Sequence, residues 1–259
     1  LEYYTDIFKN MTSGSAMKFV SKKKLLDTLF PVPPLEEQYK IANKIEELFE
    51  LIDKKEKNDK EKEKLKTLLK EKILDSAICG ELIENDLTLP AIDVEEAKED
   101  IPFDIPSNWK WSYLKNNCEK LYAGGDKPLK FSKEKNNELS VPVIANGINN
   151  DGIIGYTDIP TEMDNCLTIS GRGTIGYASI RNYPFTPIVR LITIKPKEYL
   201  NIKYLKSVMS YATESSKGTS IPQLTIPMIK NKLIPIPPLE QQKKIVEKIE
   251  ECFKLIEQL

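Results

Sequence analysis

Arginine is rare in this chain, and one arginine stands where it could do chemistry. The 38 Lys and Arg residues include only three arginines, at positions 172, 181 and 190. Arg172 lies between Gly171 and Gly173, and glycine lets a backbone come close to a ligand. A guanidinium group clamps phosphate or reads the edge of guanine. We therefore expect Arg172 to contact a nucleic acid; the alternative is a structural arginine paired with a carboxylate.

Two further loops carry residue types that suit the same chemistry. Gly124-Gly125-Asp126-Lys127-Pro128 is typical of a tight turn beside lysine, and lysines near phosphates release counterions. The Asn146–Asn150 segment offers amide side chains of the kind that pair with adenine. Both loops could equally be ordinary surface turns, which Gly and Asn-Gly favour. With a polar loop near residue 220, the candidate DNA-binding residues are Gly124, Gly125, Lys127, Lys130, Asn146, Asn149, Arg172, Thr174, Lys217, Thr219, Ser220 and Gln223.

The residue patterns that enzymes need are missing from the sequence. The chain has no histidine, which removes the commonest general base and the commonest zinc ligand. Asn182-Tyr183-Pro184-Phe185 is the nearest string to an amino-methyltransferase tetrapeptide, but its second residue is not proline. No GxxxxGK[ST] phosphate loop occurs. We expect no catalytic residue, no metal site and no cofactor in this chain.

The cysteines and the distribution of charge indicate the compartment of the protein and the kind of partner it binds. Its four cysteines are scattered without a CxxC pair, and no apolar run is long enough to cross a bilayer. We therefore expect a cytoplasmic protein without membrane contact. Residues 101–232 carry a net charge of +6, whereas residues 30–100 carry −8. This division predicts that only the basic part meets a polyanion.

The elements that hold the candidate loops include a segment that occurs twice. Pro31 to Ile52 and Pro235 to Ile256 are identical at 15 of 22 positions without a gap. In both copies, prolines precede apolar residues at helical spacing, which predicts an amphipathic helix with a narrow, coiled-coil-like stripe. A charged run joins the first copy to a second apolar stretch, so we expect one helix from Leu35 to Cys79.

The region between the two copies differs from them in its residue pattern. Short β-like runs such as IVRLITI alternate with Gly- and Asn-rich turns, and a helix is expected near residues 201–215. The predicted class is α+β, with a globular mixed α/β module flanked by long antiparallel helices. The predicted domains are 1–29 as the tail of a preceding module, 30–80 as a long spacer helix, 81–100 as a linker, 101–232 as the module and 233–259 as a distal spacer helix.

These motifs, in this order, resemble the specificity subunit of type I restriction-modification enzymes. PVPPLEEQYKIANKIEEL and PIPPLEQQKKIVEKIEEC are similar to that family's spacer repeats, and ILDSAICGELI to the end of its long helix. IPSNWKW resembles the start of a target recognition domain, and SGRGTIG and GTSIPQLT resemble its later motifs. The resemblance implies a non-catalytic subunit that reads one half of a bipartite site on double-stranded DNA.

The same resemblance implies partners. Methyltransferase subunits would dock on the recognition domain, and restriction/translocase subunits would join them. S-adenosylmethionine, ATP and Mg are expected on those partners only. Because the repeats match, we also expect that two chains can pair through their helices. The chain departs from the family in lacking most of a first recognition domain.

Two alternatives stay open at this point. The first is a coiled-coil scaffold whose globular module binds protein, which predicts no salt-dependent affinity for DNA. The second is the recognition part of a fused type II restriction–methyltransferase.

Overall fold

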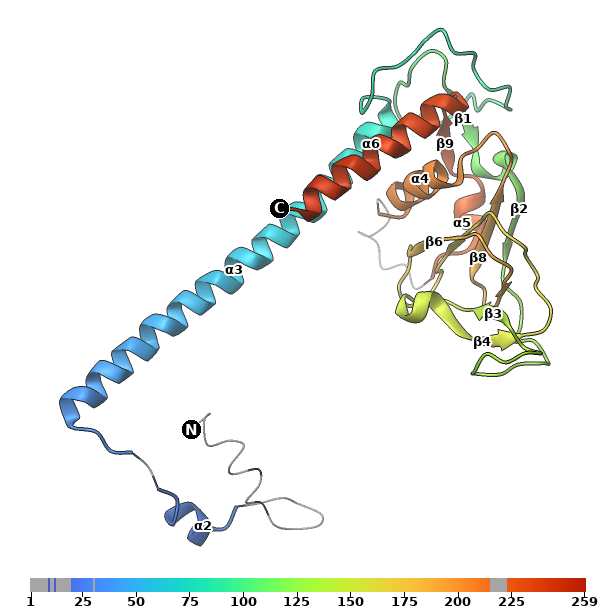
Figure 1. Cartoon of the computed structure of the whole chain (residues 1–259). Helices are drawn as coiled ribbons and strands as arrows, with labels where there is room; N and C mark the ends of the chain where they lie inside the picture. Colours follow the sequence, from blue (N-terminus) through green and yellow to red (C-terminus); the bar gives the residue numbers. More distant parts are fainter. Residues whose placement is uncertain (1–8, 10–11, 13–19, 30, 215–222) are drawn as a thin grey trace. The chain divides into compact units, whose positions relative to one another are not determined.

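The computed structural model describes residues 9, 12, 20–29, 31–214 and 223–259. The chain divides into two compact units, Leu1–Lys62 and Glu63–Leu259, and helix α3 runs across their boundary. The first unit also contains the short helix α2, Lys22–Leu26. Helices and small sheets alternate along the second unit (Figure 1), which confirms the predicted α+β class. Among the described residues, no helix is both long and apolar enough to cross a membrane.

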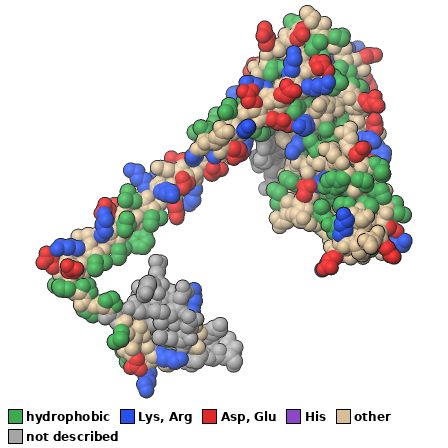
Figure 2. Space-filling model, in the orientation of Figure 1, with side chains coloured by type: hydrophobic (Ala, Val, Ile, Leu, Met, Phe, Trp, Pro, Cys, Tyr) green, Lys and Arg blue, Asp and Glu red, His purple; other side chains and the backbone are tan. Residues whose placement is uncertain are grey.

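Helix α3, Leu35–Cys79, forms over the 45 residues for which one helix is predicted. Glu36 and Glu37 occupy its first turn, where carboxylates suit the positive end of the helix dipole. The helix ends at Gly80, whose φ of +78° is left-handed. A Cβ atom there would lie 2.6 Å from Pro106, so glycine is required. Figure 2 shows hydrophobic and charged side chains mixed along the surface of this helix.

Three small sheets form the β structure of the second unit as far as its residues are described. The strands are β1 Lys110–Tyr113, β2 Cys118–Ala123, β3 Val141–Ile144, β4 Ile153–Thr157, β5 Cys166–Ile169, β6 Ala178–Arg181, β7 Thr186–Pro187, β8 Ile192–Pro196 and β9 Leu233–Ile236. The helices are α4 Ile202–Glu214, α5 Ile226–Lys230 and α6 Leu239–Glu257, with 3-10 turns η1 Leu114–Asn117 and η2 Asn149–Gly152. The sheet orders are β2-β8-β5-β6, β4-β3-β7 and β1-β9. The antiparallel β1-β9 pair brings the two ends of the module together.

The last turns of α3 share one hydrophobic core with α6 and the four-stranded sheet. Leu74, Ala77 and Ile78 of α3 are buried in the same cluster as Ile245 and Ile249 of α6. The cluster extends to α4 and to strands β5, β8 and β9. Burial of such apolar side chains is the main stabilising contribution to folding. The end of α3 is therefore an integral part of the second unit.

Helix α6 runs antiparallel to the end of α3 (Figure 1). The Lys70 ammonium forms an ion pair with Glu257, near the end of α6, and lies 5.7 Å from the ring centre of Phe253. At the start of α6, the Gln241 amide donates to the carbonyl of Asp86, beyond the end of α3. Early residues of one element therefore meet late residues of the other, which confirms the predicted antiparallel helices.

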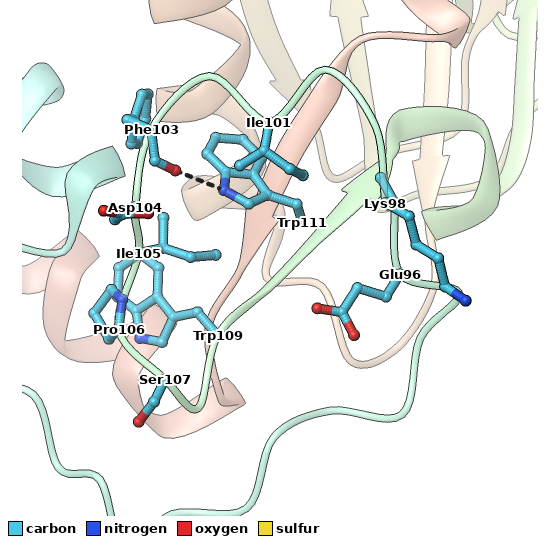
Figure 3. Close-up of a pocket in the computed structure, with 11 residues that line it drawn as sticks. Glu96, Lys98, Ile101, Phe103, Asp104, Ile105, Pro106, Ser107, Trp109 and Trp111 are labelled. Atoms are coloured by element: carbon cyan, nitrogen blue, oxygen red, sulfur yellow. Dashed lines mark hydrogen bonds between the residues drawn. The ribbon is translucent and has the colours of Figure 1, made fainter.

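Residues 81–100 form no helix or strand, yet they are packed onto the second unit. The backbone N–H of Ala97 donates to the carbonyl of Trp111 at 2.8 Å, and Ala97 is buried. The Ser112 hydroxyl donates to the carbonyl of Glu95 at 2.7 Å. Figure 3 shows the residues that follow, from Ile101 to Trp111. There the Trp111 indole N–H donates to the carbonyl of Phe103 at 3.1 Å. This segment therefore lies along the module rather than apart from it.

One predicted strand is shorter than its sequence suggests. IVRLITI reads as continuous β structure, but β8 begins only at Ile192. The N–H of Leu191 donates to the carbonyl of Ile188 at 3.1 Å, and Val189 and Arg190 have φ values of +52° and +58°. Positive φ at both central residues is the pattern of a type I′ turn. The prediction of a strand over these residues is wrong, because contacts outside the local sequence impose the turn.

The shared core generates a stability prediction. We expect Leu74→Ala to lower the free energy of unfolding by about 3 kcal/mol, because it opens a cavity under α6. Urea unfolding followed by circular dichroism measures this change. Leu255→Ala on α6 is the matched control: Leu255 is exposed, so its truncation should cost less than about 0.5 kcal/mol. Equal effects of the two substitutions would contradict the described core.

Candidate nucleic-acid interface

Two arginines and a lysine meet at one hollow in the second unit. The hollow has a volume of about 560 Å³, and its charged lining consists of three cations and one carboxylate. Its walls come from three separate loops: the turn after β2, the loop after β5 and the turn before β8. The lining residues are Ala123, Gly124, Gly125, Asp126, Lys127, Arg172, Val189 and Arg190. Four of the predicted residues, Gly124, Gly125, Lys127 and Arg172, therefore lie together.

Asn146 ties two of these loops to each other. Its side-chain oxygen accepts the backbone N–H of Gly171 at 2.8 Å, and its amide nitrogen donates to the carbonyl of Val189 at 2.7 Å. Gly171 precedes Arg172, and Val189 precedes Arg190. The Asn146 amide thus fixes both arginine-bearing loops at once. These two bonds use one N–H and one oxygen lone pair of the amide, so a base contact by Asn146, as predicted from its residue type, would use the second N–H and the second lone pair.

Glycines allow the loops to approach neighbouring backbone. A Cβ atom on Gly124 would lie 2.6 Å from the carbonyl carbon of Pro187, and one on Gly171 would lie 2.6 Å from the carbonyl oxygen of Leu224. The N–H of Leu224 donates to the carbonyl of Gly171 at 2.8 Å. These close contacts explain the two glycines without invoking a ligand, and they hold the hollow's walls in place.

The Arg172 guanidinium is exposed and engages an amide rather than a carboxylate. Its Nε and Nη2 donate to the side-chain oxygen of Gln223 at 3.2 and 3.0 Å. Two predicted site residues therefore meet across a separation of 51 positions in sequence. The alternative of a carboxylate-paired structural arginine does not apply to the described contacts of Arg172.

The two lysines predicted for this region differ in their surroundings. The Lys127 ammonium lies 3.6 Å from the ring centre of Phe131, a cation–π contact that leaves the lysine exposed at the hollow. The Lys130 ammonium forms a 2.7 Å ion pair with Asp158. The hydrogen bond between them raises the pKa of Lys130 and lowers the pKa of Asp158. Lys130 is exposed but does not line the hollow.

The remaining predicted residues lie elsewhere or outside the described chain. Asn149 is exposed at the start of η2, and Thr174 is exposed in the loop between β5 and β6. Neither lines the hollow. Lys217, Thr219 and Ser220 lie outside the described residues.

Arg190 is the functional candidate that sequence reasoning missed. It lies in the type I′ turn before β8 and is exposed beside Arg172 in the hollow's lining. Its N–H donates to the carbonyl of Gly124 at 2.9 Å, which fixes the turn against the Gly-Gly loop. Rarity of arginine was the signal that pointed to position 172, and it applied equally to position 190.

The third arginine is structural. Arg181 is buried and donates to Thr168 at 3.0 Å, to the Tyr183 hydroxyl at 2.9 Å and to the carboxylate of Asp151. The ring of Tyr183 lies edge-on to buried Phe185, with ring centres 6.4 Å apart. The string Asn182-Tyr183-Pro184-Phe185 is therefore occupied in packing around a buried cation.

A second hollow of about 560 Å³ lies beside Trp109 and Trp111 (Figure 3). Its charged lining residues are Glu96, Lys98 and Asp104, so carboxylates outnumber cations. A polyanion is repelled by such a surface. The hollow at Arg172 and Arg190 is the better candidate for nucleic acid.

Comparison with known proteins places the chain in a family. The family model described as Type I restriction modification DNA specificity domain matches residues 1–66 and 106–259. The Mycoplasma pneumoniae protein named type I specificity subunit S.MpnORF89P is 30% identical over 156 residues, which are 59% of this chain and 47% of that protein. The EcoBI specificity subunit of Escherichia coli is 26% identical over 275 residues, covering 96% of this chain and 56% of that subunit.

Solved structures share the fold. A chain from a study of complex assembly in the type I R-M system has a TM-score of 0.72 at 22% identity, covering 94% of this chain and 58% of its own. The HsdS subunit of Thermoanaerobacter tengcongensis has a TM-score of 0.57 at 22% identity, covering 97% and 60%. This chain spans about half the length of the curated relatives it matches. It belongs to the family of type I restriction-modification DNA specificity domains.

Proposed function

We propose that this chain recognises double-stranded DNA through the hollow lined by Lys127, Arg172 and Arg190. The observation that carries the proposal is the convergence of three exposed cations from three loops that hydrogen bonds hold together. Phosphate contacts by such cations supply affinity, and a guanidinium can also read guanine. Fixed loops present these groups at low entropic cost when DNA binds.

Family membership supports a proposal for the wider role. The chain reads one half of a bipartite site, and methyltransferase subunits dock on it to carry out methyl transfer. Restriction/translocase subunits then join the assembly. The chain itself is non-catalytic, so S-adenosylmethionine, ATP and Mg belong to these partners, and the whole complex acts on DNA in the cytoplasm.

We also propose that two copies of the chain pair through helix α3. Ile41, Ile45 and Ile52 of α3 are 48%, 47% and 50% exposed, whereas Ile245, Ile249 and Ile256 at the matching positions of α6 are 0%, 4% and 6% exposed. The same stripe is thus covered in one repeat and bare in the other. Two-fold pairing would place the bare stripe of one chain on that of its partner.

The DNA proposal predicts a graded loss of binding. We expect Arg172→Ala and Arg190→Ala each to weaken binding to duplex DNA about tenfold, and to reduce the slope of log affinity against log salt by about one when the arginine meets a phosphate. Fluorescence anisotropy of a labelled duplex at several salt concentrations measures both quantities.

Lys248→Ala is the control, because Lys248 is a half-buried cation on α6 that pairs with Glu251. It removes the same charge away from the hollow and should leave affinity unchanged. A wild-type chain without salt-dependent DNA affinity would overturn the proposal and favour the protein-binding scaffold instead.

The pairing proposal has its own test. Ile45→Glu inserts a charge into the bare stripe, so we expect the substituted chain to sediment as a monomer where the wild type is a dimer. Asn43→Glu adds the same charge on the same helix outside the stripe and should leave the dimer intact, because Glu247 at the matching position of α6 is exposed. Sedimentation velocity over a range of concentrations measures the populations. A wild type that stays monomeric throughout would rule out this partner.

A further inference from the structure

Val189 adopts a backbone conformation that its residue type disfavours. Its φ is +52°, and Arg190 follows with +58°, although a β-branched residue is an outlier in the left-handed region. The same chain uses Asn150 and Asp151 at another consecutive pair of positive φ values, +48° and +52°. Asn and Asp tolerate this conformation, whereas valine does not. The residue at position 189 is therefore not selected for turn formation.

Contacts from other segments hold the strained turn in place. The Val189 N–H donates to the carbonyl of Gly125 at 2.8 Å, and its own carbonyl accepts the Asn146 amide at 2.7 Å. The N–H of Ile188 donates to the carbonyl of Ile144 at 2.9 Å. Strained residues persist where their surroundings over-determine them, and they concentrate at functional sites.

The strain does not serve burial of the valine side chain. Val189 is 48% exposed and forms part of the hollow's wall, together with Arg172 and its neighbour Arg190. A turn built for stability alone would carry Asn or Gly here. This turn instead presents an apolar branched group beside two guanidinium groups on a fixed backbone.

We propose that Val189 determines sequence specificity by contacting the 5-methyl group of a thymine in the major groove. This inference rests on the proposed DNA-binding function of the same hollow. Thymine is the base that offers a methyl group there, and apolar side chains contact it. The arginines beside Val189 hold the backbone or an adjacent base, and the rigid turn sets the position of the methyl contact.

The experiment uses the whole chain with Val189→Asn and Val189→Gly. Both residues accept positive φ, so we expect each variant to melt a few degrees above the wild type. A random-sequence duplex pool, selected with the wild type, yields the preferred site. Each thymine in that site is then replaced by uracil, which lacks only the methyl group, and affinities are measured for every protein.

We expect one uracil replacement to weaken wild-type binding about fourfold, the effect of removing one buried methyl group. Both Val189 variants should bind the thymine and uracil duplexes equally. Leu255→Gln, which changes an exposed apolar residue on α6, should keep the wild-type discrimination.

Other outcomes overturn the inference in distinguishable ways. The wild type could select a site whose affinity no uracil replacement weakens, or the Val189 variants could keep the wild-type ratio of thymine to uracil affinities. Either result would show that Val189 does not contact a thymine methyl group, and it would leave the proposal of DNA recognition by the hollow intact. Variants with melting temperatures below that of the wild type would show that the backbone at Val189 is not strained, and the inference would lose its basis. A wild type that selects no site would reject the proposed function together with this inference.

Discussion

The amide of Asn146 is the interaction on which the candidate interface depends. It bonds Gly171 on one side and Val189 on the other, so a single side chain positions the loops of Arg172 and Arg190. Loss of the amide would leave the backbone N–H of buried Gly171 unsatisfied, which costs more than a net hydrogen bond contributes. The surrounding glycines at positions 124 and 171 permit the close backbone packing that brings the loops within reach of this amide. The hollow is therefore a preorganised surface rather than a chance gathering of charges.

The duplicated helical segment supplies the second constraint. An amphipathic helix must cover its apolar stripe, and α6 does so against the last turns of α3 and the core of the second unit. The first copy carries the same isoleucines in a helix that continues into that core, yet its own stripe is exposed. The two copies of the repeat therefore carry the same apolar stripe in two environments. The proposed self-association would cover the stripe of α3 by the kind of helix packing that already covers the stripe of α6.

Local pattern accounts for what could be predicted from sequence. The periodic isoleucines and strong helix formers of α3 act over neighbouring residues, so its extent from Leu35 to Cys79 could be predicted. The type I′ turn at Val189 and Arg190 was not, because valine and isoleucine favour strands and the turn is imposed by Gly124, Gly125 and Asn146 from elsewhere in the chain. Arg172 and Gln223 were both predicted from sequence, whereas their hydrogen bonding and the place of Arg190 in the same hollow became apparent only from the tertiary structure.

Hydrogen exchange with and without duplex DNA tests the central claim most directly, because it locates the bound surface without altering the protein. The account predicts slower amide exchange on DNA binding at residues 123–127, 171–173 and 188–191, the three loops around the hollow. Protection confined to another surface, such as the segment from Glu96 to Trp111, would contradict it.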